Sequence, residues 1–393
     1  MFSNRTNWKL TRNRLTEALE EVRSSGARVL DLTISNPTRV GLHFDDPRIL
    51  QSLASLQAMD YDPQPKGLLS ARGAVADYYK TAHGIHDFDP ERIILTTSTS
   101  EGYSFVFRLL CNPGDELLVP KPSYPLFEFL ADLQDVKLLS YPLIYDHGWQ
   151  MDFPSLQKVV TQRTRGVVVV HPNNPTGSYV QAQEQASLNS FCQEYGLAII
   201  ADEVFLDYAH NGAPQGSFAA NQDMLTFTLS GVSKISALPQ MKVAWIVTSG
   251  PEAEVESAQA RLEVIADTYL SMNAPIQWAV PALLEQRKSI QRQLLDRVLV
   301  NLAEFDRQLA AQKACQRLSV EGGWYTILRV PVTQTDEELA VNVLRRKSVL
   351  VHPGHFYDFP SDGYLVLSLI TAQDEFAEGI KGLLEVIASE SLL

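Results

Sequence analysis

The feature that most constrains this fold is a series of short apolar runs between about residues 90 and 250, separated by segments of helix length. The runs read RIILTT, DELLVP, GVVVVHP, LAIIADE, LTFTLS and KVAWIV. Strands with one solvent-facing side alternate apolar and polar residues, whereas continuous β-branched runs are typical of strands buried on both faces. Helices between such strands indicate a mostly parallel sheet flanked by helices. We therefore expect an α/β domain whose ligands bind beyond the carboxyl ends of the strands.

The two ends of the chain follow a different pattern. Residues 10–25 form an amphipathic segment that stops at Gly26, which predicts an N-terminal helix. After a long charged helix at about residues 284–312 come YTILRVPV, a helix at about 336–346, SVLVHPG, YLVLSLI and a final helix. A chain of 393 residues exceeds the size at which one core usually keeps growing. We therefore expect an N-terminal helix and arm over residues 1–44, a large domain over 45–285 and a smaller α+β domain over 286–393, with the arm packed on the small domain.

Composition disfavours several classes of protein. Hydrophobic residues make up 45% of the chain and charged residues 20%, which is ordinary for a globular protein and argues against disorder. A net charge of −13 disfavours binding to nucleic acid or to an anionic membrane, and no run reaches the roughly 20 apolar residues of a membrane span. The N-terminus lacks an apolar signal core, and the three cysteines lack metal-ligand spacing. We expect a cytoplasmic protein with reduced thiols and no metal site.

Three of the expected strands end in polar residues that one cofactor requires together. Asn173 and Asn174 follow the run GVVVVHP, Asp202 follows LAII, and Lys234 follows LTFTLS. Pyridoxal phosphate chemistry needs a lysine that forms a Schiff base and moves a proton, and a buried carboxylate that keeps the pyridine nitrogen protonated. An amide donor can stabilise the phenolate oxygen of the ring. Each motif alone is more often a turn, a helix cap or a strand end, but their order favours a pyridoxal phosphate site.

With these motifs the chain resembles the class I/II aminotransferases of pyridoxal phosphate fold type I, in the aspartate aminotransferase superfamily. The resemblance rests on the NPTG, DE and SK elements in the family's order and runs over nearly the whole chain. It implies a large domain with a mostly parallel seven-stranded sheet flanked by helices, plus a smaller α+β domain. It also implies that Lys234 is the Schiff-base lysine, Asp202 the partner of the pyridinium and Asn174 the donor to the ring oxygen.

The resemblance implies further contacts to the cofactor. The segment TSTSE falls where the family binds the phosphate at the start of a helix, and orphan N–H groups and hydroxyls at a helix N-terminus suit a dianion. Tyr124 resembles the aromatic residue that stacks on the pyridine ring. Tyr61 resembles a tyrosine that reaches the phosphate from the other subunit, which implies a homodimer with shared sites. The implied contacts to the phosphate are Ser98, Thr99, Ser100, Ser233, Lys242 and Tyr61.

Three departures from the family's pattern affect the cofactor and the substrate pocket. Lys242 stands where the family usually has an arginine on the phosphate, so the charge is kept and the two-pronged geometry is lost. Phe205 stands where a tyrosine usually donates to the phenolate oxygen, and Tyr208, one helical turn on, is a candidate substitute. Asn36 lies at or beside a usual glycine near the substrate carboxylate, so we expect Asn36 and Asn174 to contact the substrate.

The fourth departure concerns the arginine that binds the substrate carboxylate in a bidentate pair in this family. Its position aligns with Val366 in the segment GYLVLS. A carboxylate buried without a partner would lose several kcal/mol of binding energy. Three explanations are open: another cation, Arg39 or Arg329, supplies the contact; the substrate lacks a conventional α-carboxylate; or the reaction has changed or been lost.

The leading hypothesis is a ping-pong aminotransferase in which Lys234 carries the cofactor and moves the proton. A small-molecule amino acid or amine is the donor, and a 2-oxo acid is the acceptor. A lyase or decarboxylase on the same fold, or a pyridoxal phosphate-binding protein without turnover, are the alternatives. A Rossmann oxidoreductase is disfavoured because no G-x-G-x-x-G follows the first strand.

Overall fold

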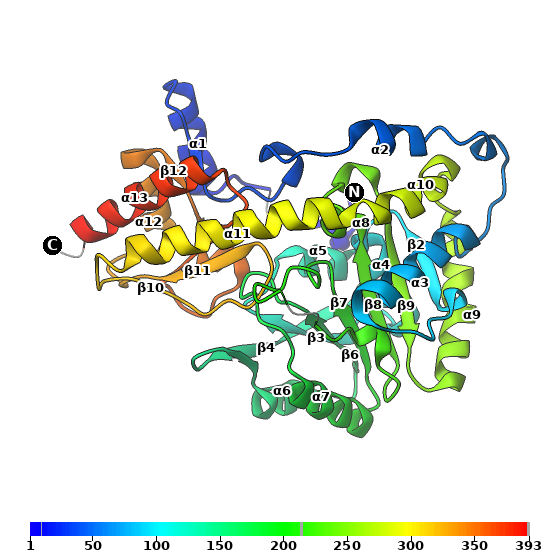
Figure 1. The fold of residues 1–393 in the computed structure, drawn as a ribbon. Coiled ribbons are helices and arrows are strands. Elements are labelled where there is room, and N and C mark those ends of the chain that lie inside the picture. The colour runs from blue at the N-terminus through cyan, green and yellow to red at the C-terminus, as the bar shows by residue number, and fades with distance from the viewer. Residues whose placement is uncertain (9, 213–214, 391–393) are drawn as a thin grey trace.

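The computed structural model describes residues 1–8, 10–212 and 215–390, and it shows an α/β body joined to a smaller lobe (Figure 1). The body is built on one eight-stranded sheet with the order β2-β9-β8-β7-β6-β3-β4-β5. Strands β3, β4, β6, β7 and β8 run parallel, and β9 is antiparallel to both of its neighbours. The bounds are β2 (Ile93–Thr96), β3 (Glu116–Lys121), β4 (Lys137–Tyr145), β5 (Trp149–Met151), β6 (Thr164–Val170), β7 (Ala198–Asp202), β8 (Thr226–Gly231) and β9 (Ala244–Ser249).

This sheet confirms the predicted α/β class and the mostly parallel order of the strands. It has one strand more than the seven expected, because β5 forms an antiparallel hairpin with the end of β4. A strand of three residues, Trp149–Met151, is too short to show a periodic pattern of its own. The hairpin therefore could not be predicted from the sequence.

Neighbouring residues of the central strands are buried on opposite sides of the sheet. Val168 and Ile200 pack in one cluster with residues of α4 and α9, whereas Val167 and Ile199 pack in a second cluster with residues of α7. The helices are α4 (Thr99–Leu110), α7 (Ala182–Tyr195) and α9 (Glu252–Tyr269). Both faces of these strands are covered, which is the physical reason for their continuous apolar runs.

The remaining helices of the body cover the other end of the sheet and its connections. Residues of α3 and α10 pack in one cluster with Trp245 of β9, on the side of the sheet edge formed by β2. No helix in the described part of the chain is long and apolar enough to cross a membrane. The bounds are α2 (Asp46–Ser52), α3 (Leu69–His83), α5 (Leu126–Leu133), α6 (Phe153–Val159), α8 (Val232–Ile235) and α10 (Ala274–Glu285).

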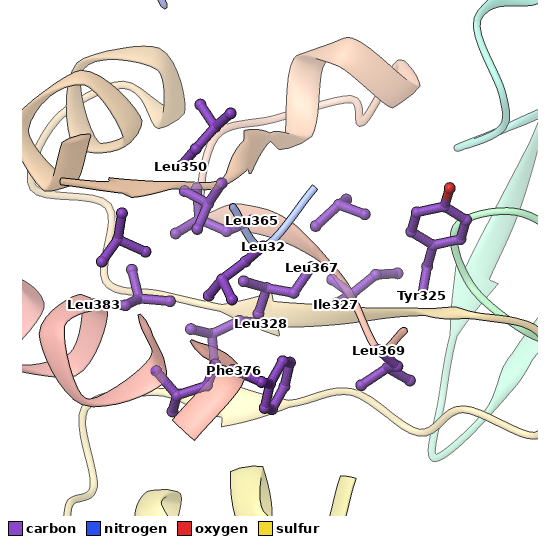
Figure 2. Packing of buried hydrophobic residues seen from close by; sticks show 14 of the residues in the cluster. Leu32, Tyr325, Ile327, Leu328, Leu350, Leu365, Leu367, Leu369, Phe376 and Leu383 are labelled. Carbon is purple, nitrogen blue, oxygen red and sulfur yellow. The ribbon is translucent and has the colours of Figure 1, made fainter. Parts of the chain in front are cut away.

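The small lobe contains a four-stranded sheet with the order β10-β11-β14-β13. Its core is formed by Leu328, Leu365 and Leu367 of the sheet with Phe376 and Leu383 of the last helix (Figure 2). The elements are β10 (Gln316–Arg317), β11 (Tyr325–Arg329), β13 (His352–Pro353), β14 (Tyr364–Ser368), α11 (Arg287–Leu309), α12 (Asp336–Lys347) and α13 (Gln373–Glu390).

The N-terminal arm packs on this lobe. Helix α1 (Arg14–Ser24) contacts α12, and β1 (Leu30–Asp31) pairs in parallel with β12 (Val349–Leu350). The helix begins later than the sequence pattern predicts, because the Asn13 side chain accepts a hydrogen bond from the Thr16 N–H at 2.8 Å and caps it there. The arm thus runs from the small lobe back toward the body (Figure 1).

Candidate active site

Lys234 lies in the one-turn helix α8, directly after β8, beside the strands β7 and β6 that carry the other two motifs. Its amine lies 5.0 Å from the ring centroid of Trp324 and 5.4 Å from that of Phe205. Burial in these surroundings lowers the pKa of the Lys234 amine to about 8, although the charge of Asp202 acts to raise it. Lys234 is therefore a partly neutral, nucleophilic amine near physiological pH.

The turn that carries Lys234 is held by its neighbours. The buried Tyr208 hydroxyl donates to the Lys234 carbonyl oxygen at 2.7 Å. A Cβ added at Gly231 would lie 2.7 Å from the Val243 carbonyl oxygen, so glycine is needed where β8 and β9 approach. Because the Tyr208 hydroxyl is engaged with the backbone of Lys234, it is not directed to a ligand and does not replace the hydroxyl that Phe205 lacks.

Asp202 ends β7 and interacts electrostatically with Lys234. Its carboxylate accepts hydrogen bonds from the Tyr103 hydroxyl at 2.9 Å and from the Val204 N–H at 3.1 Å. Burial raises the pKa of Asp202, whereas these hydrogen bonds and the charge of Lys234 lower it. Tyr103 was not predicted as a site residue, because an aromatic residue on the apolar face of a helix is usually a packing residue.

Asn174 lies in the loop that follows β6. In this loop Asn173 Oδ1 accepts hydrogen bonds from the Thr176 hydroxyl at 3.0 Å and from the Thr176 N–H at 3.3 Å. Asn174 itself is buried, and its Oδ1 has no hydrogen-bond partner among the described residues. Buried amides are normally satisfied, so the Asn174 amide is suited to the polar atoms of a ligand.

The turn from β2 into α4 offers a site for an anion. Ser98 caps the helix by accepting the Glu101 N–H at 3.2 Å, and Glu101 accepts the Thr97 N–H at 2.6 Å. Thr99 and Ser100 are the first residues of α4, so their N–H groups have no partner within the helix. Together with the hydroxyls of these partly exposed residues, they suit a phosphate dianion.

Two more predicted phosphate contacts lie on either side of α8. Ser233 is partly buried next to Lys234, and Lys242 is exposed just before β9. The backbone of Lys242 is left-handed, with φ +55°. Its ammonium has no ion-pair partner in the described part of the chain, so its charge is available to an anion.

Tyr124 lies in the loop between β3 and α5 and is 47% exposed. Burial and the negative charge of Asp202 both raise the pKa of the Tyr124 phenol. The adjacent Ser123 N–H donates to the Tyr357 carbonyl oxygen at 2.9 Å. The small lobe thus closes against the loop that carries Tyr124.

Two predicted site residues, Tyr61 and Asn36, are exposed, and their surroundings differ from those of the other predicted site residues. Tyr61 is 82% exposed and lines a surface pocket with Met272 and Trp278, and no other predicted site residue lines that pocket. Asn36 is exposed, and its Oδ1 accepts hydrogen bonds from the Thr38 N–H at 3.0 Å and the Thr38 hydroxyl at 2.7 Å. The Asn36 oxygen is therefore used to cap the short helix Pro37–Arg39, and only its amide nitrogen is left for a ligand.

The two arginines considered as carboxylate ligands differ in position. Arg329 bonds to Gln316 of β10, on the far side of β11 from Val366, so its guanidinium is directed away from that residue. Arg39 is exposed at the end of its short helix and has no ion-pair partner among the described residues. Val366 itself is 1% exposed. No group of histidine, cysteine and acidic residues in the described ranges is arranged to hold a metal ion.

Known proteins are similar to this chain over most of its length. The family described as aminotransferase class I and II matches residues 27–375. The alanine aminotransferase of Mycobacterium tuberculosis is 27% identical over 92% of this chain and 86% of its own. The glutamate-pyruvate aminotransferase AlaA of Escherichia coli is 31% identical over 69% of this chain and 67% of its own. Among solved structures, the alanine aminotransferase from Pyrococcus furiosus has a TM-score of 0.90 at 21% identity, covering 99% of this chain and 100% of that one.

The fold is that of pyridoxal phosphate enzymes of fold type I, and one edge of its large sheet carries a lysine, a carboxylate and an amide. The family match covers most of the chain, so the chain belongs to the aminotransferase class I and II family, whose members transfer amino groups between amino acids and 2-oxo acids with pyridoxal phosphate. The unsatisfied amide of Asn174 and the partly buried pair of Lys234 and Asp202 fit this cofactor.

Proposed function

We propose that Lys234 binds pyridoxal phosphate covalently and moves the proton in each half of a ping-pong transamination. The cofactor supplies an electron-withdrawing ring that stabilises negative charge on the substrate's α-carbon. The observation that carries the proposal is the partly buried Lys234 amine, which interacts electrostatically with the Asp202 carboxylate and whose pKa is lowered to about 8. An amine of that pKa attacks a carbonyl carbon and accepts a proton near neutral pH.

The surrounding residues have separate tasks in this proposal. Asp202, held by the Tyr103 hydroxyl, keeps a proton on the pyridine nitrogen. The Asn174 amide donates to the ring oxygen and contacts the substrate, with the Asn36 amide nitrogen as a second substrate contact. Tyr124 covers one face of the ring. The phosphate is held by Ser98, Thr99, Ser100, Ser233 and Lys242, with Tyr61 from a second copy of the chain.

The position of Tyr61 supports a homodimer. This side chain is 82% exposed and lies apart from the other proposed site residues of its own chain, so a contact with the phosphate would come from a second copy. We also infer an arm over residues 1–44, a large domain over 45–285 and a small domain over 286–393, supported by the packing of α1 on α12. A cytoplasmic location is part of the same proposal.

The names of the relatives suggest which substrates to try first. Relatives named alanine aminotransferase and glutamate-pyruvate aminotransferase make alanine and glutamate the preferred donors, with pyruvate and 2-oxoglutarate as acceptors. A second reaction has weaker support from the S-alkyl-thiohydroximate lyase SUR1 of Arabidopsis thaliana, which is 28% identical over 61% of this chain and 52% of its own. A lyase on the same lysine would break a bond at the substrate's β-carbon or sulfur instead of exchanging an amino group.

A half-reaction without acceptor separates these functions. Holoenzyme is mixed with alanine, glutamate, simple amines or sulfur-containing amino acids, and the visible absorbance of the cofactor is followed together with the released oxo acid. A transaminase loses the absorbance, releases one oxo acid per subunit and regains the absorbance when a 2-oxo acid is added. Continuous release of ammonia without acceptor would instead establish a lyase, and no response to any compound would establish a protein without turnover.

A further inference from the structure

The small-lobe sheet turns one face toward the arm and the body. Residues two apart on a strand share a face, so Val366 and Ser368 of β14 point the same way. The Ser368 hydroxyl donates to the Ile34 carbonyl oxygen of the arm at 2.6 Å. Leu365 and Leu367 lie on the opposite face (Figure 2), and Val366 belongs with them to the hydrophobic cluster of the lobe. Val366 therefore lies on the face of the sheet that contacts the arm.

Tyr325 of β11 shows that this face reaches the active site. It pairs with Ser368 across the sheet, so the two side chains share a face. Figure 2 shows the Tyr325 ring apart from the leucine side chains of the core, beside the ribbon of the body. Burial raises the pKa of Tyr325, and an electrostatic interaction with the Tyr124 phenol raises it further. Tyr124 follows Ser123, whose N–H donates to the Tyr357 carbonyl oxygen at 2.9 Å, so the lobe meets the loop that carries Tyr124.

His352 is the residue on this face that is placed to donate a hydrogen bond to a carboxylate near Val366. It lies on β13 directly opposite Val366, and directly opposite residues in antiparallel strands have Cβ atoms about 5 Å apart. The neighbour on the other side is the apolar Ile327. Arg329 shares this face, but its guanidinium is bonded to Gln316 beyond β11. A carboxylate above Val366 therefore meets an imidazole rather than a guanidinium.

Among the described residues, only one nitrogen of the His352 ring has a hydrogen-bond partner. Its Nδ1 lies 3.1 Å from the Tyr357 hydroxyl, and Tyr357 is 5% exposed and fixed to the body through the Ser123 N–H. When the Tyr357 hydroxyl donates to Nδ1, Nε2 carries the hydrogen and has no protein acceptor among the described residues. Burial lowers the pKa of His352, and the charge of Asp31 raises it. Nε2 is a hydrogen-bond donor both in this neutral tautomer and in the charged imidazolium.

We propose that His352, positioned by Tyr357, donates a hydrogen bond from Nε2 to the carboxylate of the amino acid and of the 2-oxo acid, in place of an arginine at position 366. The inference rests on the proposed transaminase function and names the group that recognises its substrates. A single imidazole donor gives up the second hydrogen bond of a bidentate arginine. The enzyme should consequently discriminate less sharply between amino acids and simple amines than an arginine site does.

Binding without turnover tests this assignment. 2-Methylalanine and tert-butylamine have the same branched carbon and amine, and only the first has a carboxylate. Neither has a hydrogen on the α-carbon, so neither can be transaminated. Calorimetric titration of the holoenzyme with both gives a ratio of dissociation constants that reports on the carboxylate alone. This ratio can be measured even if the half-reaction experiment identifies another chemistry, so failure of the two proposals can be told apart.

The variants are chosen to separate His352 from its neighbours. His352→Gln should weaken 2-methylalanine about tenfold, the effect of losing a hydrogen bond to a charged group, and should leave tert-butylamine within about twofold. Tyr357→Phe should give a smaller loss confined to 2-methylalanine, which a merely structural role would not produce. His355→Gln is the matched control, because His355 is exposed in the same short helix Gly354–Tyr357. Circular dichroism and melting temperature establish that each variant is folded.

Three results would overturn the proposal. An unchanged ratio in folded His352→Gln and Tyr357→Phe proteins means that the imidazole does not bind the carboxylate. A selective loss in Arg39→Gln instead assigns the carboxylate to the arm. Equal affinity of the wild-type enzyme for both compounds means that it has no carboxylate site.

Discussion

Replacing Gly177 with alanine tests how the loop carrying Asn174 is held against the small lobe. Gly177 has φ +67°, a conformation that costs an L-residue about 1 kcal/mol. An added Cβ would also lie 2.4 Å from the Gly322 carbonyl oxygen and 2.4 Å from Val320 Cγ2. Overpacking of this kind costs about 1–3 kcal/mol. We therefore expect Gly177→Ala to lower the free energy of unfolding by about 2–4 kcal/mol in total.

The same substitution should impair the active site. The Gly177 carbonyl oxygen accepts the Gly322 N–H at 2.9 Å and the Glu321 N–H at 3.2 Å, so the clash acts on the contact between loop and lobe. Asn174, three residues earlier in this loop, would shift with it. We expect weaker cofactor binding and a lower kcat/KM in addition to the lower stability.

Gly196→Ala is the matched control for this prediction. Gly196 has φ +66°, but an added Cβ there would meet no atom within 4 Å. The free energy of unfolding of this variant should fall only by the conformational cost of about 1 kcal/mol, and its activity should be unchanged. Denaturant unfolding of both variants, with cofactor affinity measured by fluorescence, gives the comparison. Equal destabilisation of the two variants would refute the argument from the contact with Gly322 and Val320.

Three further predictions concern charge, substrate and assembly. In the cofactor-free protein, the acylation of Lys234 should increase with pH and reach its midpoint near pH 8, because burial lowers the pKa of this amine to about 8 and only the neutral amine reacts. Peptide mapping measures the extent of acylation at each pH, and a midpoint near pH 10.5 would show that burial does not lower this pKa. Val366→Arg should bind 2-methylalanine more tightly and melt at a lower temperature, because a charge replaces a side chain that is 1% exposed; a lower melting temperature with no gain in affinity would show that the position is only packed. Tyr61→Ala and Lys234→Ala proteins, refolded together, should form mixed dimers with one complete site and more activity than the mean of the two parents; activity equal to that mean would exclude shared sites.

Sequence patterns predict the half of the site that lies on the body. Asn174, Asp202 and Lys234 each follow a strand whose apolar run is visible in the sequence, and parallel strands bring their carboxyl ends to one edge. The helix start at Thr99 was predictable for a similar reason, because a hydroxyl cap precedes it. In each case a local pattern determines a local structure, and the order of the strands then brings these local structures together at one edge of the sheet.

The half of the site that comes from the small lobe could not be predicted in this way. Trp324 lies over the Lys234 amine because the lobe folds back on the body, whereas His352 lies beside Val366 because β13 pairs with β14 within the lobe. Neither residue has a local pattern that distinguishes it from a packing residue. Arg329 illustrates the converse, since its charge made it a candidate in the sequence, but strand pairing directs its guanidinium toward Gln316.

The central claim is that the amine of Lys234 is the one that binds pyridoxal phosphate. Reduction of the holoenzyme with borohydride converts the bond between cofactor and lysine into a stable one, and digestion with mass spectrometry then identifies the modified residue among all lysines of the chain. We expect one cofactor per subunit, carried by the peptide that contains Lys234. Modification of another lysine, such as the exposed Lys242, or of none, would contradict it.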